Sequence, residues 1–256
     1  MTDSDDANQQ QSLPQAPFLS HLVELRERLL RALLAVVLVM LCLFPFAQQL
    51  YTTLARPLIA KLPEGSSMVA VEVASPFLVP FKLTLLLAVV ITVPYVLYQI
   101  WGFVAPGLYQ NERKLALPIL LASILLFYTG MAFAYIVVFP LVFGFFTSVA
   151  PEGVEVMTDI NHYLSFVTTL FIAFGIAFEV PIATFVMVAT GLTTPEQLRK
   201  ARPYVIVAAF VIGMLLTPPD IISQVLLALP MWLLYELGII FSRSFMRRRA
   251  SEQSTG

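Results

Sequence analysis

The sequence predicts an all-α integral membrane protein with six transmembrane helices. Two observations carry this prediction. Of the 256 residues, 59% are hydrophobic and only 12% are charged, whereas soluble domains have about 45–50% apolar and about 25% charged residues. In addition, long apolar runs recur along the chain, and about 20 such residues cross a bilayer as a helix. A chain with so few charges does not cover the surface of a soluble globule of this size.

The ends of the chain differ in composition from the apolar middle. Residues 1–17 are polar and acidic and lack the basic region of a cleaved signal peptide, so we expect a disordered cytoplasmic tail. Residues 18–243 form the predicted six-span membrane domain, and 244–256 form a basic cytoplasmic tail. The single cysteine, Cys42, rules out an intrachain disulfide.

The first two spans are predicted at residues 29–47 and 77–103. The first run is interrupted only by Arg31 near its start. Before the second run, Ser75 followed by proline is typical of a helix start. Lys82 lies near the beginning of this span, where its ammonium group is expected to snorkel to the interface.

The third charge-free run is too long for a simple span. It covers 36 residues, 115–150, and such a helix would be about 54 Å long, against a hydrocarbon core of about 30 Å. We therefore place the third span at 115–139 and expect bends at Pro118 and Pro140. The fourth span, 162–189, contains Glu179 followed closely by Pro181.

The last two spans, 203–217 and 221–241, are predicted to be short. Before them, Thr194-Pro-Glu-Gln197 is typical of a capping box and should open a short surface helix with Arg199, Lys200 and Arg202. A re-entrant hairpin would leave four spans rather than six. We favour six because each run is nearly long enough and local bilayer thinning costs only a fraction of a kcal/mol per Å.

The lysines and arginines beside the spans predict the orientation, because cytoplasmic loops carry an excess of them. With six spans, twelve fall on one side and three on the other, so both termini are predicted to be cytoplasmic. The twelve are Arg26, Arg28, Arg31, Arg113, Lys114, Arg199, Lys200, Arg202, Arg243, Arg247, Arg248 and Arg249, and the three are Arg56, Lys61 and Lys82.

Two carboxylates fall on the predicted cytoplasmic side, on either side of the first two spans. Glu24 lies on the polar face of an amphipathic segment, 18–31, and Glu112 lies in the loop before span three. The simpler interpretation is that Glu24 pairs with Arg28 four residues on and that Glu112 is a first-turn acid of span three. The alternative is that the two carboxylates bind two guanidinium groups of a partner, since carboxylates bind guanidinium with two parallel hydrogen bonds.

The charged residues within the last spans have different interpretations. A charge near the middle of a span costs about 2.5–3.5 kcal/mol, so Glu179 predicts that span four faces protein or a water-filled groove rather than lipid. A protonated glutamate bonded to a neighbouring helix is the alternative. Glu236 lies near the cytoplasmic end of span six and can snorkel, and Asp220 lies in a turn, where aspartate is ordinary.

The sequence offers little for an enzyme. The two histidines, His21 and His162, are predicted on opposite sides of the membrane, so they do not share a metal site. Neither a nucleophile elbow, a zinc-protease motif nor a glycine-rich phosphate loop is present. From composition alone, the main competitor to a receptor is a small-solute secondary transporter that uses Glu179 as a proton or ion site, although such transporters often show repeats and no repeat is visible here.

Six short motifs in order give the chain a resemblance to the TatC family, the polytopic core of the twin-arginine protein translocase. They are HLVELRER (21–28), VASPF (73–77), LYQNER (108–113), FGIAFEVP (174–181), RPY (202–204) and LTPPD (216–220). Each motif alone would be weak, whereas six in the family's order are specific.

The resemblance implies a cupped six-span bundle in the bacterial inner membrane that receives folded precursors bearing Arg-Arg signal peptides. It implies that Glu24 and Glu112 bind the arginine pair, with Arg26 and Phe103 also in the signal-binding site. It places Glu179, Pro57 and Asp220 on the concave or partner face. The implied partners are the single-span proteins TatB and TatA, membrane lipid and further copies in a receptor complex. Transport would run on the proton-motive force, with no cofactor, metal, covalent chemistry or nucleic acid.

Overall fold

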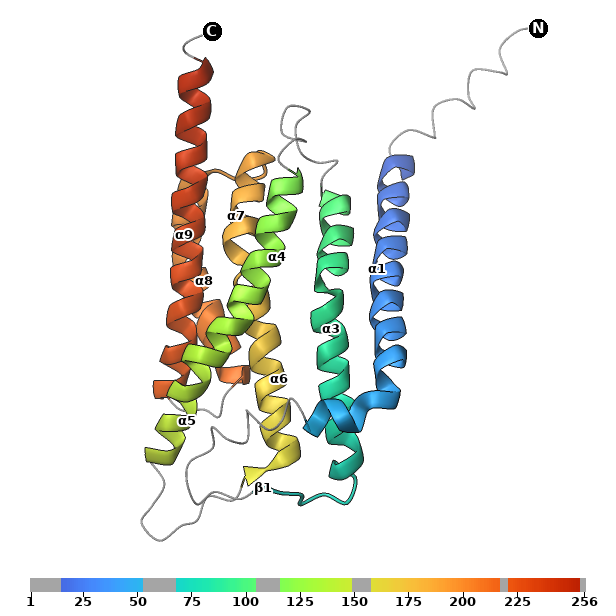
Figure 1. The fold of residues 1–256 in the computed structure, drawn as a ribbon. Helices are drawn as coiled ribbons and strands as arrows, with labels where there is room; N and C mark the ends of the chain where they lie inside the picture. The colour runs from blue at the N-terminus through green and yellow to red at the C-terminus, as the bar shows by residue number, and fades with distance from the viewer. Residues whose placement is uncertain (1–14, 53–67, 105–115, 149–157, 217–220, 254–256) are drawn as a thin grey trace, which may run out of the picture.

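The computed structural model of the chain describes residues 15–52, 68–104, 116–148, 158–216 and 221–253. Figure 1 shows these residues as a bundle of long helices, with α1 and α9 at opposite flanks. Glu24 of α1 and Arg247 of α9 mark one end of the bundle, called here the termini end, and the short strands β1 and β2 mark the strand end. Three predicted site residues, Pro57, Glu112 and Asp220, lie outside the described residues.

The first two long helices form one side of the bundle. α1 spans Gln15–Leu43 and continues through the 3-10 turn η2, Phe44–Phe46, to residue 52, and α3 spans Ser75–Val104. Ala32 is the one buried side chain in the described part of α1, and the apolar Leu29 and Leu41 are 67% and 63% exposed. α1 stands at the edge of the bundle against α3 (Figure 1), and most of its large apolar side chains are exposed, as on a lipid-facing helix.

The third span is continuous but irregular. α4 spans Ala116–Phe133, a π-helical turn η5 spans Ala134–Val138, and α5 spans Phe139–Ser148. The π turn comes just before Pro140, which has no N–H to donate to the preceding turn, so the predicted irregularity there has a physical cause. The bend predicted at Pro118 is absent, because that proline lies in the first turn of α4, where the missing N–H has no helical partner to lose.

The fourth span breaks where the sequence places a glutamate before a proline. α6 spans Ile160–Ala177 and α7 spans Val180–Ala189, and Glu179 lies in the intervening turn. Pro181 falls in the first turn of α7, where it is tolerated. At the other end of α6, Asp159 accepts hydrogen bonds from the amides of Asn161 and His162, both at 2.9 Å, so it is a side-chain N-cap.

The strand end holds a small polar network. β1 (Met68–Val69) pairs in parallel with β2 (Thr158–Asp159). Lys82 of α3 donates to Asn161 at 2.6 Å and to Ser165 at 2.9 Å, both on α6. The side chain is half-buried against a neighbouring helix, so it is held by polar partners rather than by the simple snorkelling expected from the sequence.

The last two helices extend beyond the predicted short spans. α8, Pro195–Leu216, is one helix of 22 residues that joins the predicted surface helix and span five, and α9, Ile221–Gln253, has 33 residues. The capping box is confirmed, because the Thr194 amide donates to Gln197 Oε1 at 3.0 Å and the Gln197 amide to Thr194 Oγ1 at 3.3 Å. Pro203 does not end the helix. It is exposed, so the carbonyl of Arg199 that it leaves without a helical donor lies at the surface.

The described helices agree with a polytopic membrane protein. Five stretches are long and apolar enough to cross a bilayer: Leu22–Thr52, Ser75–Val104, Ala116–Phe145, Ile160–Ala189 and Gln224–Arg247. α8 is not among them because its first two turns are charged. As a single helix of 22 residues it is nevertheless about 33 Å long, which matches the hydrocarbon thickness of about 30 Å. α8 and α9 run side by side (Figure 1), so the arrangement is that of five spans and a sixth, more polar helix.

Candidate functional site

The first candidate site lies on α1 at the termini end. Glu24 Oε1 accepts hydrogen bonds from Arg28 Nε at 3.0 Å and Nη2 at 2.8 Å, so the guanidinium binds the carboxylate with two N–H groups. The side chains are 38% and 25% exposed, respectively. The simpler interpretation of Glu24 is therefore confirmed as the geometry of this structure. The pair also shows that the Glu24 carboxylate lies where a guanidinium can reach it.

Arg28 joins α1 to the end of α3. A Cβ placed on Gly102 of α3 would collide with Arg28 Nη1, so the absence of a side chain at 102 admits the guanidinium. Phe103 follows directly and is half-buried in the last turn of α3. The structure thus brings Glu24 and Phe103 to the same end of the α1–α3 pair, with Arg28 between the helices.

Of the other two predicted signal-binding residues, Arg26 is described by the structure and Glu112 is not. Arg26 is exposed on α1 at the termini end, two residues from Glu24. Glu27, on the same helix, pairs with Arg31 at 3.3 Å, and both side chains are about 60% exposed. Since Glu112 lies outside the described residues, the predicted pairing of two carboxylates across the site stays a prediction.

The second candidate site surrounds Glu179 in the broken fourth span. Trp101 Nε1 donates to Ser123 Oγ at 3.0 Å, and Ser123 Oγ donates to Glu179 Oε2, so a polar chain joins α3, α4 and the turn before α7. The other oxygen, Glu179 Oε1, is buried and has no hydrogen-bond partner among the described residues. The glutamate is therefore bonded to neighbouring helices, as one of the two sequence interpretations expected.

An apolar cavity of about 760 Å³ adjoins this chain, and Glu179 lies in its wall. Its lining comes mainly from α3, α6 and α7 and includes Leu97, Trp101, Ile176 and Met187. A cavity of this size beside a buried carboxylate oxygen suits a largely apolar ligand or side chain that carries one hydrogen-bond donor. Whether a partner helix uses it stays a prediction, as do the roles assigned to Pro57 and Asp220, which lie outside the described residues.

One ion pair was missed from the sequence. Arg202 of α8 donates from Nη2 to Glu236 Oε2 of α9 at 2.6 Å, and the two side chains are 37% and 19% exposed. The sequence patterns account for each residue separately, Arg202 as part of a surface helix and Glu236 as a snorkelling acid. Two opposite charges near the same end of consecutive spans are the signal that could have paired them.

The described residues hold no cluster of three or more histidine, cysteine, aspartate or glutamate side chains that could bind a metal ion. The two candidate sites differ in character. The Glu24 site is a charged surface feature at the termini end, and the Glu179 site is an internal polar chain beside an apolar cavity. The arrangement suits binding of charged and helical partners.

Comparison with known proteins identifies similar sequences and folds. Residues 20–230 match the family model described as Sec-independent protein translocase protein (TatC). The chain is 57% identical over 240 residues to the TatC protein of Azotobacter chroococcum mcd 1, covering 94% of both chains. It is 56% identical over 230 residues to that of Escherichia coli K12, covering 90% of this chain and 89% of the relative.

A solved structure shows the same fold. The crystal structure of a twin arginine translocase receptor, TatC, superposes with a TM-score of 0.78 at 39% sequence identity. The match covers 87% of this chain and 98% of that one. At this identity the likeness extends to sequence as well as to helix arrangement.

Proposed function

The chain belongs to the TatC family of Sec-independent protein translocase proteins, and we propose that it is the subunit that recognises the signal peptides of exported precursors. The family is one of multi-pass membrane translocase components and not of enzymes. More specifically, we propose that the chain binds the Arg-Arg signal peptides of folded precursors at the termini end of the bundle, and that this end faces the cytoplasm.

The observation that carries this proposal is the Glu24–Arg28 pair. A half-exposed carboxylate at one end of the bundle already receives two N–H groups from one guanidinium. An arginine of a signal peptide offers the same group, and each charge-assisted hydrogen bond contributes about 1.5–3 kcal/mol. We propose that a signal arginine displaces or joins Arg28 at Glu24 and that Glu112 receives the second arginine.

The neighbouring residues complete the proposed signal-binding site. Phe103 supplies an aromatic surface at the end of α3, and Arg26 adds a cation beside Glu24 that would hold an acidic or polar group of the signal. A lysine pair carries the same charge, but an ammonium does not form the two-pronged contact of a guanidinium. The proposed site therefore discriminates by geometry rather than by charge.

We also propose the partner face and the setting. Glu179, with its cavity, and Pro57 and Asp220 would contact the single-span proteins TatB and TatA in a complex with several copies. The excess of lysine and arginine on the side of both termini supports a cytoplasmic location for them in the bacterial inner membrane. Transport would be driven by the proton-motive force.

The test is site-specific crosslinking from positions 24 and 112 to a model precursor whose signal carries either Arg-Arg or Lys-Lys. Crosslinks that depend on the arginines support the proposal, because the two signals have equal charge. Equal crosslinking to both signals would mean that the carboxylates provide only a negative surface.

Affinity measurements with matched variants sharpen the test. Glu24→Gln should weaken binding of the Arg-Arg signal by at least tenfold, which corresponds to about 1.4 kcal/mol. The control is Glu27→Gln on the same helix, since Glu27 is 59% exposed and pairs with Arg31. Equal losses in the two variants, or no loss in Glu24→Gln, would contradict the assignment of the site.

A further inference from the structure

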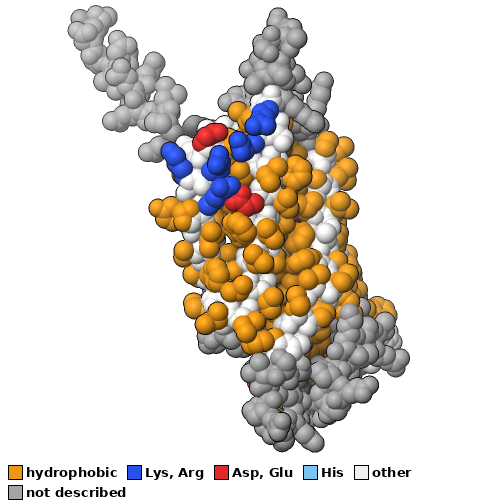
Figure 2. Space-filling view, turned by 90° about the vertical axis from the view of Figure 1, so that its left-hand side faces the viewer, with side chains coloured by type: hydrophobic (Ala, Val, Ile, Leu, Met, Phe, Trp, Pro, Cys, Tyr) orange, Lys and Arg blue, Asp and Glu red, His pale blue; other side chains and the backbone are white. Residues whose placement is uncertain are grey.

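The basic side chains of α8 and α9 gather at the termini end of the flank opposite α1. Figure 2 shows lysine and arginine side chains together near the top of this face, above a broad hydrophobic surface. The described ones are Arg199, Lys200 and Arg202 of α8 and Arg243 and Arg247 of α9. The described acidic side chains of the two helices here are Glu196 and Glu236, so five positive charges face two negative ones and the net charge is +3.

The charge of this patch is only partly neutralised by the protein. Arg202 pairs with Glu236, yet its Nε is buried and has no hydrogen-bond partner among the described residues. None of the other four basic side chains forms an ion pair with a described residue. The four other basic side chains therefore offer cationic groups to an anion, whereas the buried Nε of Arg202 does not reach the surface.

A recess lies within the patch. Its volume is about 350 Å³, and it is lined by Glu196, Arg199, Lys200 and Arg202. Three cations outnumber the one carboxylate in this lining, so the recess attracts an oxyanion such as a phosphate.

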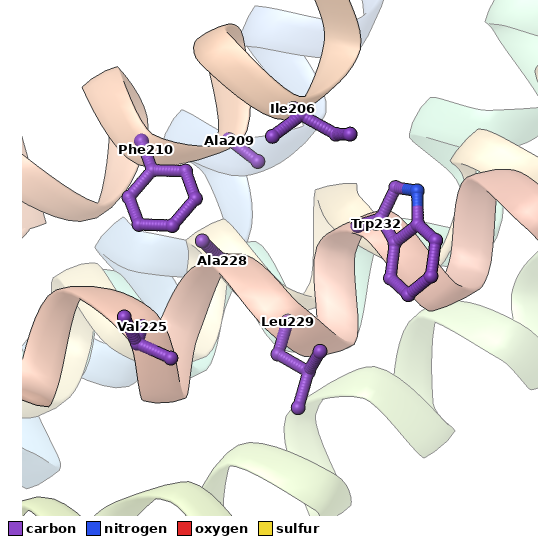
Figure 3. A pocket seen from close by; sticks show the side chains of 7 residues that line it. All are labelled: Ile206, Ala209, Phe210, Val225, Ala228, Leu229 and Trp232. Atoms are coloured by element: carbon purple, nitrogen blue, oxygen red, sulfur yellow. The ribbon is translucent and has the colours of Figure 1, made fainter. Parts of the chain in front are cut away.

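An apolar groove lies between α8 and α9 below the recess. Figure 3 shows its lining, with Ile206, Ala209 and Phe210 from one helix and Val225, Ala228, Leu229 and Trp232 from the other. The groove has a volume of about 220 Å³. Ile206 follows Arg202 by four residues and Arg199 by seven, which places all three on one face of α8. The groove thus begins on the face of α8 that carries Arg199 and Arg202 of the recess, one turn further along the helix from Arg202.

Trp232 lies in the lining of the groove. It precedes Glu236 by four residues, one turn of α9, and its Nε1 is buried with no hydrogen-bond partner among the described residues. Residue 232 lies near the middle of the 221–241 span, so its indole ring supplies apolar surface for an acyl chain rather than a contact to a headgroup.

We propose that the α8–α9 surface binds an anionic phospholipid, with the headgroup phosphate in the Arg199–Lys200–Arg202 recess and an acyl chain in the groove below. Arg243 and Arg247 extend the positive surface around the headgroup. A general excess of basic residues on one side of the membrane explains the charge but not the recess among three of them or the apolar groove further along the same two helices. This inference is independent of signal-peptide recognition, because α1 stands at the opposite flank.

The experiment is a titration of the full-length, detergent-purified protein with phosphatidylglycerol and, separately, phosphatidylcholine, followed by native mass spectrometry. The wild-type protein should retain phosphatidylglycerol in preference to phosphatidylcholine. Lys200→Gln should weaken retention about fivefold, which is the effect of one basic residue near an anionic surface. The charge-matched control is Arg31→Gln on α1, whose side chain is 60% exposed at the same end of the bundle.

Two further arms separate the lipid from its alternatives. Ile206→Gln makes the groove lining polar at a side chain that is 37% exposed, so it should weaken retention while leaving the thermal transition of the protein close to that of the wild type. Inorganic phosphate should compete poorly, because it has no acyl chain for the groove. Equal weakening by Lys200→Gln and Arg31→Gln, equal retention of the two lipids, or full displacement by phosphate would each overturn the proposal.

Discussion

Removing the hydroxyl of Ser123 should destabilise the folded protein. This hydroxyl is fully buried, accepts from Trp101 Nε1 and donates to Glu179 Oε2. Ser123→Ala therefore leaves two half-buried polar groups, Trp101 Nε1 and Glu179 Oε2, without this partner, while Glu179 Oε1 already lacks one among the described residues. A buried group left unpaired costs about 1–3 kcal/mol, and the adjoining cavity offers room for water that recovers part of this.

We therefore expect Ser123→Ala to cost about 1–3 kcal/mol. For a protein of this size, 1 kcal/mol lowers the Tm by about 2–4 °C, so the thermal transition in detergent should fall by about 2–12 °C. Trp101→Phe removes one donor and leaves the bond to Glu179, so its effect should be smaller, about 0.5–1.5 kcal/mol. The matched control is Thr129→Val on α4, because the exposed Thr129 hydroxyl donates only to the carbonyl of Leu125 at 2.7 Å.

A double variant tests the reasoning most directly. Ser123→Ala combined with Glu179→Leu removes the hydroxyl together with the carboxylate that it serves, so only Trp101 Nε1 is left without its partner, and replacing both members of a bonded pair by apolar groups can be nearly neutral. The double variant should thus be more stable than Ser123→Ala alone. If Ser123→Ala leaves the Tm unchanged, or if the double variant loses the sum of the two single effects, the polar chain does not stabilise the fold as argued.

Two more predictions follow from packing and from helix capping. Gly238→Ala should destabilise the folded protein by about 1–3 kcal/mol, because the new Cβ would lie 3.0 Å from Pro181 Cα in α7 and would also collide with Thr184. In the same thermal assay, Gly144→Ala should instead stabilise the protein by up to about 1 kcal/mol, since a Cβ there meets no atom within 4 Å. The backbone amides of His162 and Val71 donate hydrogen bonds to the Asp159 carboxylate and lower the pKa of this group. Its contribution to stability is therefore complete above the unfolded pKa of about 3.9 and is lost as the pH falls through the lower, folded value. Asp159→Asn should show a smaller decrease of Tm than the wild type between pH 5 and pH 2, and an identical decrease would contradict this role.

Local sequence patterns predicted most of the helices because each is a property of a contiguous segment. Apolar runs located α3 and the third and fourth spans, and the Thr194–Gln197 capping box marked the start of α8. The i,i+4 spacing likewise predicted the Glu24–Arg28 pair, which is confirmed. The continuity of α8 through Pro203 was missed, because a proline at an exposed position removes a hydrogen bond that the surface can replace.

Local sequence patterns did not predict which side chains form hydrogen bonds between helices. The bond from Trp101 to Ser123, and that from Arg202 to Glu236, join residues 22 and 34 positions apart. Both depend on which faces of two helices meet, and apolar runs without polar periodicity do not specify a face. The prediction that Glu179 bonds to a neighbouring helix is confirmed, because a charge within a span is costly without a polar partner. The sequence does not say which residue is that partner.

The two surfaces at the termini end can be tested separately because they stand on opposite flanks. The Glu24 site lies between α1 and α3, and the proposed lipid site lies on α8 and α9 (Figure 1). Effects of substitutions that are far apart and share no partners usually add. A Glu24→Gln/Lys200→Gln double variant should then lose signal affinity as Glu24→Gln does and lipid retention as Lys200→Gln does. A loss of signal affinity in Lys200→Gln alone would show that the bound lipid couples the two flanks, in which case the bundle transmits the state of one surface to the other.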